Sequence, residues 1–170
     1  AVAVLADSTA HDAGPLLSKL LGDVHPAVRA STARALGRRR DEGAVLALRT
    51  GLGDREEAVR EASLRSLLQI EAAVPAEAAV RKTLQQGVGG WVKELVSAGG
   101  EVERSLARSL LLRLGDRGQL PSLRELSQSG NAEVRRLLVE QLGSEIEFVA
   151  GLLRDAVFAV RFAAAQKLAH

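Results

Sequence analysis

The stretch LGDVHPAVR at residues 21–29 recurs along the chain and decides the fold. LGDREEAVR at residues 52–60 and LRDAVFAVR at residues 153–161 share its pattern of Leu-x-Asp, four further residues and Val-Arg. A fourth copy ends in Val134-Arg135 but has Ser129 where the others have Asp. Successive Val-Arg pairs lie 31 or 26 residues apart, which is the length of two helices with short turns. The sequence therefore predicts repeated helical pairs.

Apolar residues follow each Val of this pattern at helical spacing. Five residues after the Val comes a small or aliphatic side chain, and eight residues after it comes a Leu: Ala33, Leu64, Val139 and Ala165, then Leu36, Leu67, Leu142 and Leu168. Offsets of 0, 5 and 8 fall on one side of a helix with 3.6 residues per turn, so each Val begins a buried stripe. Alternation with a period of two, which a strand would show, is absent. The sequence predicts an all-α fold.

The first helix of each pair is also visible, at residues 15–21, 42–52, 121–126 and 145–153. Glycines follow several apolar stripes, where we expect left-handed helix ends: Gly22, Gly53, Gly115 and Gly143. We predict an α-solenoid of about five antiparallel helix pairs over residues 12–170. It is irregular near residues 75–100, where Gly87-Val-Gly-Gly90 breaks the pattern. Residues 1–11 are expected to be an N-terminal tail or the remnant of a preceding repeat.

Composition excludes several classes of protein and site. Only 2% of the residues are aromatic, which argues against a β-sandwich or barrel. The chain has no Cys, so it has no disulfide, thiolate metal site or Cys nucleophile. Its three His residues are scattered at positions 11, 25 and 170, and no apolar run approaches the roughly 20 residues that span a membrane. We expect no catalytic residue, no metal, no cofactor and no membrane span.

The repeated phrase, with a closing Ala35-Leu36-Gly37, resembles HEAT repeats, and in particular the bacterial HEAT-like type named after phycobilisome lyases. The resemblance covers most of residues 12–170. It implies a fold that scaffolds, a few enzymes and some DNA-repair proteins share, so it does not by itself fix a function. It also implies a structural ladder, in which the repeat Asp reaches backbone and Arg groups of neighbouring repeats: Asp23, Asp54 and Asp155 with Arg29, Arg60, Arg135 and Arg161.

The second helix of each pair is expected to line the concave face of such a solenoid, with offsets of 2, 6 and 10 from the Val pointing outward. These offsets begin at Ala30, and they give a candidate binding row of Arg34, Arg38, Arg65, Arg108 and Arg136. Arginines in a row could follow a phosphate backbone, but Glu61 and Glu140 interrupt this one. The whole chain carries 23 Lys and Arg against 21 Asp and Glu, a net charge of +2. So small an excess of positive charge argues against a nucleic-acid-binding surface.

Aromatic residues supply the remaining candidates. Trp91 is the only Trp; it either anchors the core or, if exposed, is the strongest candidate for a binding contact on the concave face. Phe148 is expected to pack inward. Phe158 and Phe162 flank a repeat Val and cannot both share its buried stripe, so we expect them to cover the face of a further repeat beyond residue 170.

These observations favour a non-catalytic scaffold, a cytoplasmic HEAT-repeat module of a larger bacterial protein. Its concave face would bind a protein partner or another domain of the same chain. A nucleic-acid-binding solenoid that uses the Arg row is the alternative. A bilin-lyase-like subunit ranks third, because so few aromatic residues are available to hold a chromophore.

Overall fold

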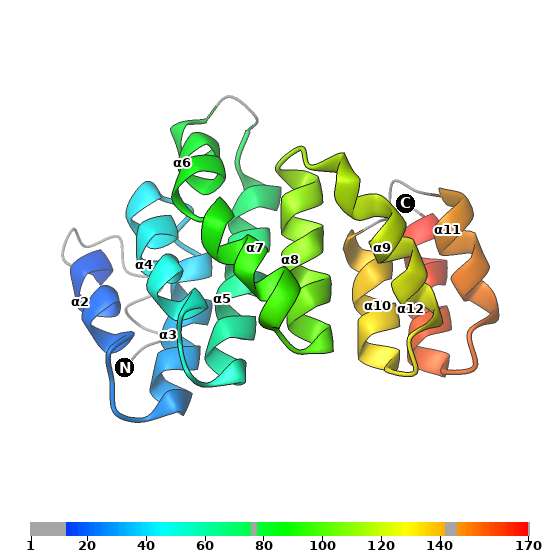
Figure 1. The fold of residues 1–170 in the computed structure, drawn as a ribbon, viewed down its shortest axis with the longest axis horizontal. Helices are drawn as coiled ribbons and strands as arrows, with labels where there is room; N and C mark the ends of the chain where they lie inside the picture. Colours follow the sequence, from blue (N-terminus) through cyan, green and yellow to red (C-terminus); the bar gives the residue numbers. More distant parts are fainter. Residues whose placement is uncertain (1–12, 76–77, 142–145, 170) are drawn as a thin grey trace.

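The computed structural model describes residues 13–75, 78–141 and 146–169, and these residues contain helices and no strand. The helices follow one another as five pairs (Figure 1). The pairs are α2 (Ala13–Leu20) with α3 (Pro26–Gly37), α4 (Glu42–Leu52) with α5 (Glu57–Ala73), α7 (Gly89–Ala98) with α8 (Glu101–Arg113), α9 (Leu120–Glu125) with α10 (Ala132–Gln141), and α11 (Ile146–Gly151) with α12 (Phe158–Leu168). The predicted all-α solenoid is confirmed. The predicted tail, residues 1–11, lies outside the described residues.

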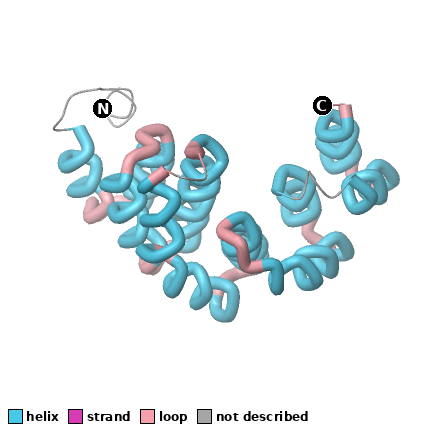
Figure 2. Tube along the Cα trace, turned by 90° about the horizontal axis from the view of Figure 1, so that it is seen from above, coloured by secondary structure: helices cyan, strands magenta, loops and turns pink. Residues whose placement is uncertain are grey.

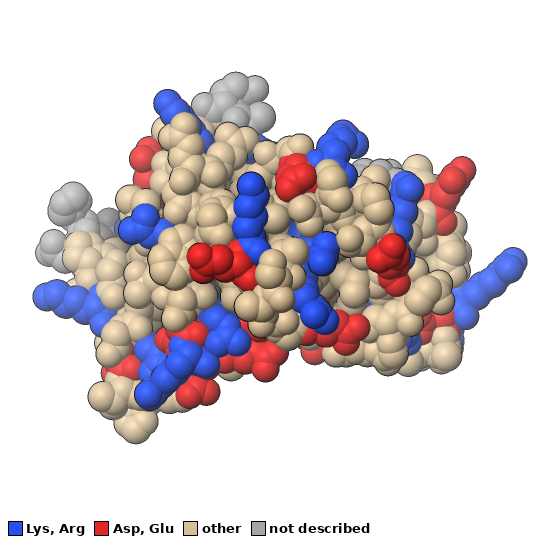
Figure 3. Space-filling model, viewed as in Figure 1, with Lys and Arg blue, Asp and Glu red and all other residues tan. Residues whose placement is uncertain are grey.

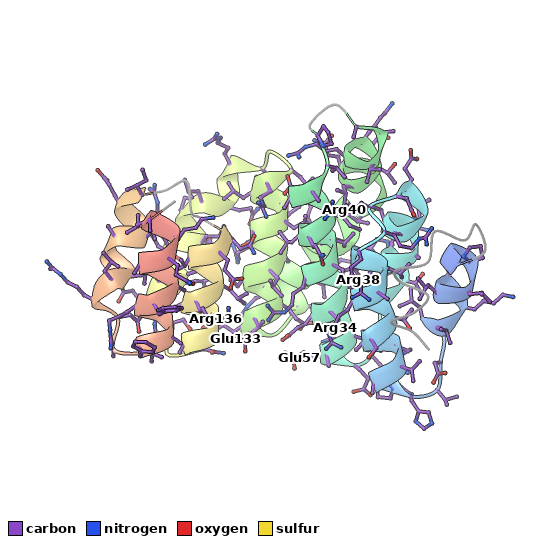
Figure 4. The ribbon with its side chains drawn as sticks, turned by 180° about the vertical axis from the view of Figure 1, so that it is seen from behind. Arg34, Arg38, Arg40, Glu57, Glu133 and Arg136 are labelled. Atoms are coloured by element: carbon purple, nitrogen blue, oxygen red, sulfur yellow. The ribbon has the colours of Figure 1, made fainter. Side chains whose placement is uncertain are left out.

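The pairs stack into an arc (Figure 2). The second helices α3, α5, α8, α10 and α12 line its inner, concave side, while α7, α9 and α11 stand on the outer, convex side (Figures 1 and 4). Short 3-10 helices at Arg117–Gln119, Leu126–Gln128 and Leu152–Arg154 shape the turns of the last two pairs. Within the described part of the chain, no helix is both long and apolar enough to cross a bilayer.

The core follows the predicted stripe. Val59, Val134 and Val160 are fully buried, whereas Val28 is only half-buried. Ala165 in the last pair is exposed, because no described helix covers that side of α12.

Close packing between α3 and α5 buries Ala30, which the helical offsets had pointed outward. A Cβ added at Gly37 of α3 would lie 2.8 Å from the Cβ of Ser66 on α5. Small side chains bring the two helices so near each other that α5 covers this part of α3. Ala30 therefore belongs to the interface between pairs and not to the concave surface.

The irregular segment contains one helix in addition to the pairs. Helix α6 (Ala79–Gly87) packs on α4, and α7 pairs with α8. A single buried residue, Val88, separates α6 from α7, so α7 already begins at Gly89. The predicted break at these glycines is confirmed, because α6 ends at Gly87 and a new helix begins at Gly89.

Of the three predicted left-handed glycines that the structure describes, Gly22, Gly53 and Gly115, one has a positive φ. Gly115 has a φ of +108°, and Gly143 lies outside the described residues. Gly22 and Gly53 do not have positive φ; their N–H groups donate to the carbonyls of Lys19 and Thr50 in a tightened last turn. The left-handed residue between α3 and α4 is Arg40, with a φ of 54°.

Candidate functional site

Arginine–carboxylate bonds hold successive pairs in register, and the first of them starts at Arg29. Its Nε and Nη2 donate to the two carboxylate oxygens of Asp54 in the next pair, at 2.6 and 2.8 Å. Its Nη1 donates to the backbone carbonyls of Asp23 and Val24 in its own turn. One guanidinium thereby ties two inter-helix turns together, and Asp54 also caps the turn by accepting from the Glu56 N–H.

Arg135 repeats this arrangement in the C-terminal half, donating to the carboxylate of Asp155 at 2.6 and 2.9 Å. In its own turn, Ser129 replaces the repeat Asp and accepts from the Asn131 N–H. The guanidinium of the paired arginine, followed by a backbone N–H, holds the pKa of both Asp54 and Asp155 below the usual aspartate range.

A third bond, from Arg60, uses a carboxylate that the repeat pattern did not identify. Arg60 Nε and Nη2 donate to Glu103 at 2.6 and 3.2 Å, and Glu103 is fully buried. The same carboxylate accepts from the Gly100 N–H at 2.7 Å and so caps α8. A Glu three residues after a helix-capping position is the signal that could have found it. We call Arg29–Asp54, Arg60–Glu103 and Arg135–Asp155 the charge ladder.

A groove opens on the concave side between α5, α8 and α10, with a volume of about 310 Å³. Its floor is apolar and formed by Leu68, Leu106 and Leu137, each at most 4% exposed. Its rim is polar, with Arg65, Gln69, Arg113, Glu140 and Gln141. An apolar floor with a few polar groups around it suits side-chain and main-chain contacts to a ligand or partner.

A buried carboxylate supports the wall of this groove. Glu71 on α5 is 5% exposed, and its two oxygens lie 2.7 Å from Arg81 Nη2 and 3.0 Å from Arg113 Nε. Arg113 also donates to Gln141 of α10 at 3.3 Å. The cluster connects α5, α6, α8 and α10, and sequence patterns gave no sign of it because its members lie 10 to 70 positions apart.

Two arginines of the expected row, Arg65 and Arg136, pair with neighbouring carboxylates. Arg65 Nη2 lies 2.8 Å from Glu133 Oε1 on α10, and Arg136 pairs with Glu140 one turn along its helix. Figure 4 shows Glu57 and Glu133 on the same face as Arg34 and Arg136. Burial, and then the nearby carboxylates, raise the pKa of Glu61, although Arg65 opposes them. The concave face thus carries both signs of charge.

The remaining members of the row occupy separate places. Arg34 is exposed on α3, and Arg38 follows it at the end of the same helix (Figure 4). Arg108 is half-buried and does not line the groove. It lies two residues after Leu106, about 200° around α8, so this helix contributes Arg113 to the groove in its place.

Trp91 does not join the concave candidates. It lies on α7, a first helix, and is 45% exposed. Helix α7 stands on the convex side of the arc (Figures 1 and 2). Its ring packs over Gly53 at the end of α4, where an added Cβ would lie 3.0 Å from it. The extra helix α6 makes α7 the first helix of its pair, and sequence spacing could not reveal this shift. Figure 3 shows charges of both signs interspersed over this convex face.

Among the described residues, no three His, Cys, Asp or Glu side chains gather as a metal site would require. His25 is exposed at the start of α3; its backbone N–H donates to the Asp23 carboxylate, and its carbonyl accepts from the N–H groups of Val28 and Arg29. What the structure does show on the concave side is the groove with an apolar floor and a polar rim.

Known proteins share this architecture. The family model described as HEAT repeats matches residues 13–98. No curated protein sequence matches the chain closely enough to count as a relative.

Among solved structures, the complex of CpcE and CpcF of phycocyanin lyase from Nostoc sp. PCC7120 is similar, with a TM-score of 0.58 at 20% identity over 91% of this chain. The chain spans 63% of that neighbour's length. An engineered protein is similar over 99% of this chain and 87% of its own, with a TM-score of 0.59 at 19% identity. A designed armadillo repeat protein in complex with the peptide (KR)4 is similar over 99% of this chain and 89% of its own, with a TM-score of 0.58 at 16% identity.

Proposed function

The chain belongs to the HEAT-repeat proteins, and from that premise we propose that it is a non-catalytic interaction scaffold that binds a protein partner, or another domain of its own chain, on its concave face. Repeat solenoids of this kind are typical of protein-interaction scaffolds. Binding on the concave face is supported by one observation, the groove between α5, α8 and α10.

The groove offers the two kinds of contact that a peptide segment needs. An apolar side chain fits over Leu68, Leu106 and Leu137, which bury it without exposing polar groups. The side-chain amides of Gln69 and Gln141 each present a donor and an acceptor to a partner's main chain. A structural neighbour, the designed armadillo repeat protein, is in complex with a peptide, which supports this mode for the shared fold.

Charge argues for a protein partner over a nucleic acid. A phosphate backbone laid along the Arg row would face Glu61, Glu133 and Glu140, and it would have to displace the carboxylates that pair with Arg65 and Arg136. Alternating charges instead suit a protein surface that carries both signs. The likeness to phycocyanin lyase, at 20% identity, concerns the fold, so a bilin-lyase role gains no support from it.

The test is capture from a lysate of the source organism, with and without nuclease, followed by elution over a salt series. A Gln69→Trp variant fills the groove, and Gln86→Trp places the same ring on exposed α6 as a matched control. We expect a protein that is recovered in both nuclease arms by the wild type and by Gln86→Trp but not by Gln69→Trp. Capture that vanishes with nuclease, or that elutes steeply with salt together with nucleic acid, contradicts the proposal.

A further inference from the structure

One end of the concave groove has more negative than positive charge. Arg65 on its rim lies 2.8 Å from Glu133 and 3.8 Å from Glu61, so two carboxylates share one guanidinium and leave a net charge of −1. Arg65 donates its hydrogen bond to Glu133. The Glu61 side chain is 24% exposed and accepts no hydrogen bond from any described residue. Burial raises the pKa of Glu61, as expected for a carboxylate with too few favourable partners.

The opposite end of the groove has the reverse imbalance. Glu71 lies 2.7 Å from Arg81 and 3.0 Å from Arg113, so two guanidiniums share one buried carboxylate and leave a net charge of +1. Glu71 Oε2, the oxygen nearer to Arg113, accepts no hydrogen bond within the described ranges. Arg113 is 32% exposed and, among the residues that the structure describes, uses one of its five N–H groups, in the bond to Gln141. Its guanidinium therefore has donors left for a ligand in the groove.

An apolar floor separates these two ends. Glu61 and Glu71 both lie on α5, ten residues apart, which is about 15 Å along the helix axis. Leu68 of the floor lies between them on the same helix. An extended chain covers this distance in about four to five residues. Glu140, the other charged residue of the rim, is already paired with Arg136 on its own helix. The groove is therefore negative at one end, apolar in the middle and positive at the other end.

We propose that the partner presents a segment with a basic, an aliphatic and an acidic residue in that spatial order, and that the basic residue binds at Glu61 and the acidic residue at Arg113. This inference rests on the proposed function, because it names the chemistry of the segment that the groove binds. Each contact brings an opposite charge to a group that is largely removed from water and short of hydrogen bonds. The reverse orientation places like charges together at both ends, so the charges also set the direction of the segment.

Selection of random peptides displayed on phage, with the 170-residue chain as the target, tests the composition of this segment. We expect the enriched peptides to carry an aliphatic residue between a Lys or Arg and an Asp or Glu. The two charged residues should lie about four to five positions apart, which matches the length of the groove. Gln69→Trp, which fills the groove, should not bind these peptides.

Titration of one enriched peptide, labelled with a fluorophore, identifies the contacts. Arg113→Gln and Glu61→Gln should each weaken its binding about tenfold. Replacing the acidic residue of the peptide with Gln should cost about tenfold on the wild type but little on Arg113→Gln, where the contact is already lost. Arg113→Lys keeps the charge and should retain most of the affinity. Arg49→Gln and Glu94→Gln remove charges from exposed residues outside the groove and should bind like the wild type.

Failure of this inference and failure of the proposed function give different results. A selection that enriches no peptide, or only peptides that Gln69→Trp still binds, contradicts binding in the groove and removes the basis of the inference. Peptides that need the groove but lack either charge overturn the inference and leave the proposed function standing. The same holds for peptides that Arg113→Gln and Glu61→Gln bind as tightly as the wild type does.

Discussion

Replacing Glu103 with Gln tests whether buried carboxylates hold the helical pairs together. Glu103 is fully buried, accepts from Arg60 at 2.6 and 3.2 Å, and accepts from the Gly100 N–H at 2.7 Å. Glutamine preserves the shape and leaves one oxygen for the cap. Its amide group, however, brings donors toward the donors of Arg60, so the charged half of the bond is lost.

The structure sets the size of the effect. Breaking a buried ion pair costs about 3–5 kcal/mol, and a hydrogen bond to a charged group about 1.5–3 kcal/mol. The Arg60 side chain is 21% exposed, so water partly solvates it when the carboxylate is gone. We therefore expect Glu103→Gln to lower the free energy of unfolding by about 2–3 kcal/mol. For a domain of this size, about 2–4 °C per kcal/mol gives a fall in Tm of about 4–12 °C.

Urea unfolding followed by circular dichroism at 222 nm measures the change, with Glu94→Gln on α7 as the exposed control, expected within about 0.5 kcal/mol of the wild type. A double-mutant cycle with Arg60→Gln should give a coupling of about 1–3 kcal/mol. If Glu103→Gln is as stable as the control, or if the cycle shows no coupling, the ladder does not stabilise the stack and the reasoning fails.

Two further predictions concern pH and packing. Because the pKa of Asp155 is lowered in the folded state, its contribution to stability is complete above the ordinary aspartate pKa of about 4 and is lost as the pH falls through the folded-state value. Asp155→Asn should therefore reduce the loss of stability that acid causes. A variant that loses as much stability in acid as the wild type would contradict this. Gly51→Ala places a Cβ 3.2 Å from the Ser63 Cβ and should destabilise the folded protein by about 1–3 kcal/mol. Gly151→Ala, with open space around it in α11, should stabilise the folded protein by about 0.5–1 kcal/mol. Thermal unfolding that ranks the two variants the other way would contradict the packing.

The repeated motif predicts the fold because it encodes local geometry. The Val positions and the apolar residues after them report on a single helix face, which depends only on the helical period. Val59, Val134 and Val160 are accordingly buried. The position of α6 depends instead on packing against α4, a contact between distant segments, and periodicity does not encode it. The placement of Trp91 on a first helix, α7, could not be predicted for that reason.

The site residues also differ in whether a local sequence pattern reveals them. The repeat Asp and Arg residues stand out because they recur, whereas Glu103 fills the same role from a different place in its helix. Glu71 joins helices that are far apart in sequence, so it carries no local signal. The concave row could be located from helical offsets, but its neutralisation depends on Glu133, which reaches Arg65 from another pair. Charge pairing across repeats becomes visible only once the repeats are stacked.

Hydrogen exchange on the chain, alone and with its captured protein partner, tests whether the concave groove is the binding surface. If the partner lies in the groove, exchange slows in the groove helices, at residues 57–73, 101–113 and 132–141, and is unchanged in α7 and α9 on the convex side. Protection confined to α7 and α9 would contradict binding in the groove and move the binding surface to the opposite face of the solenoid.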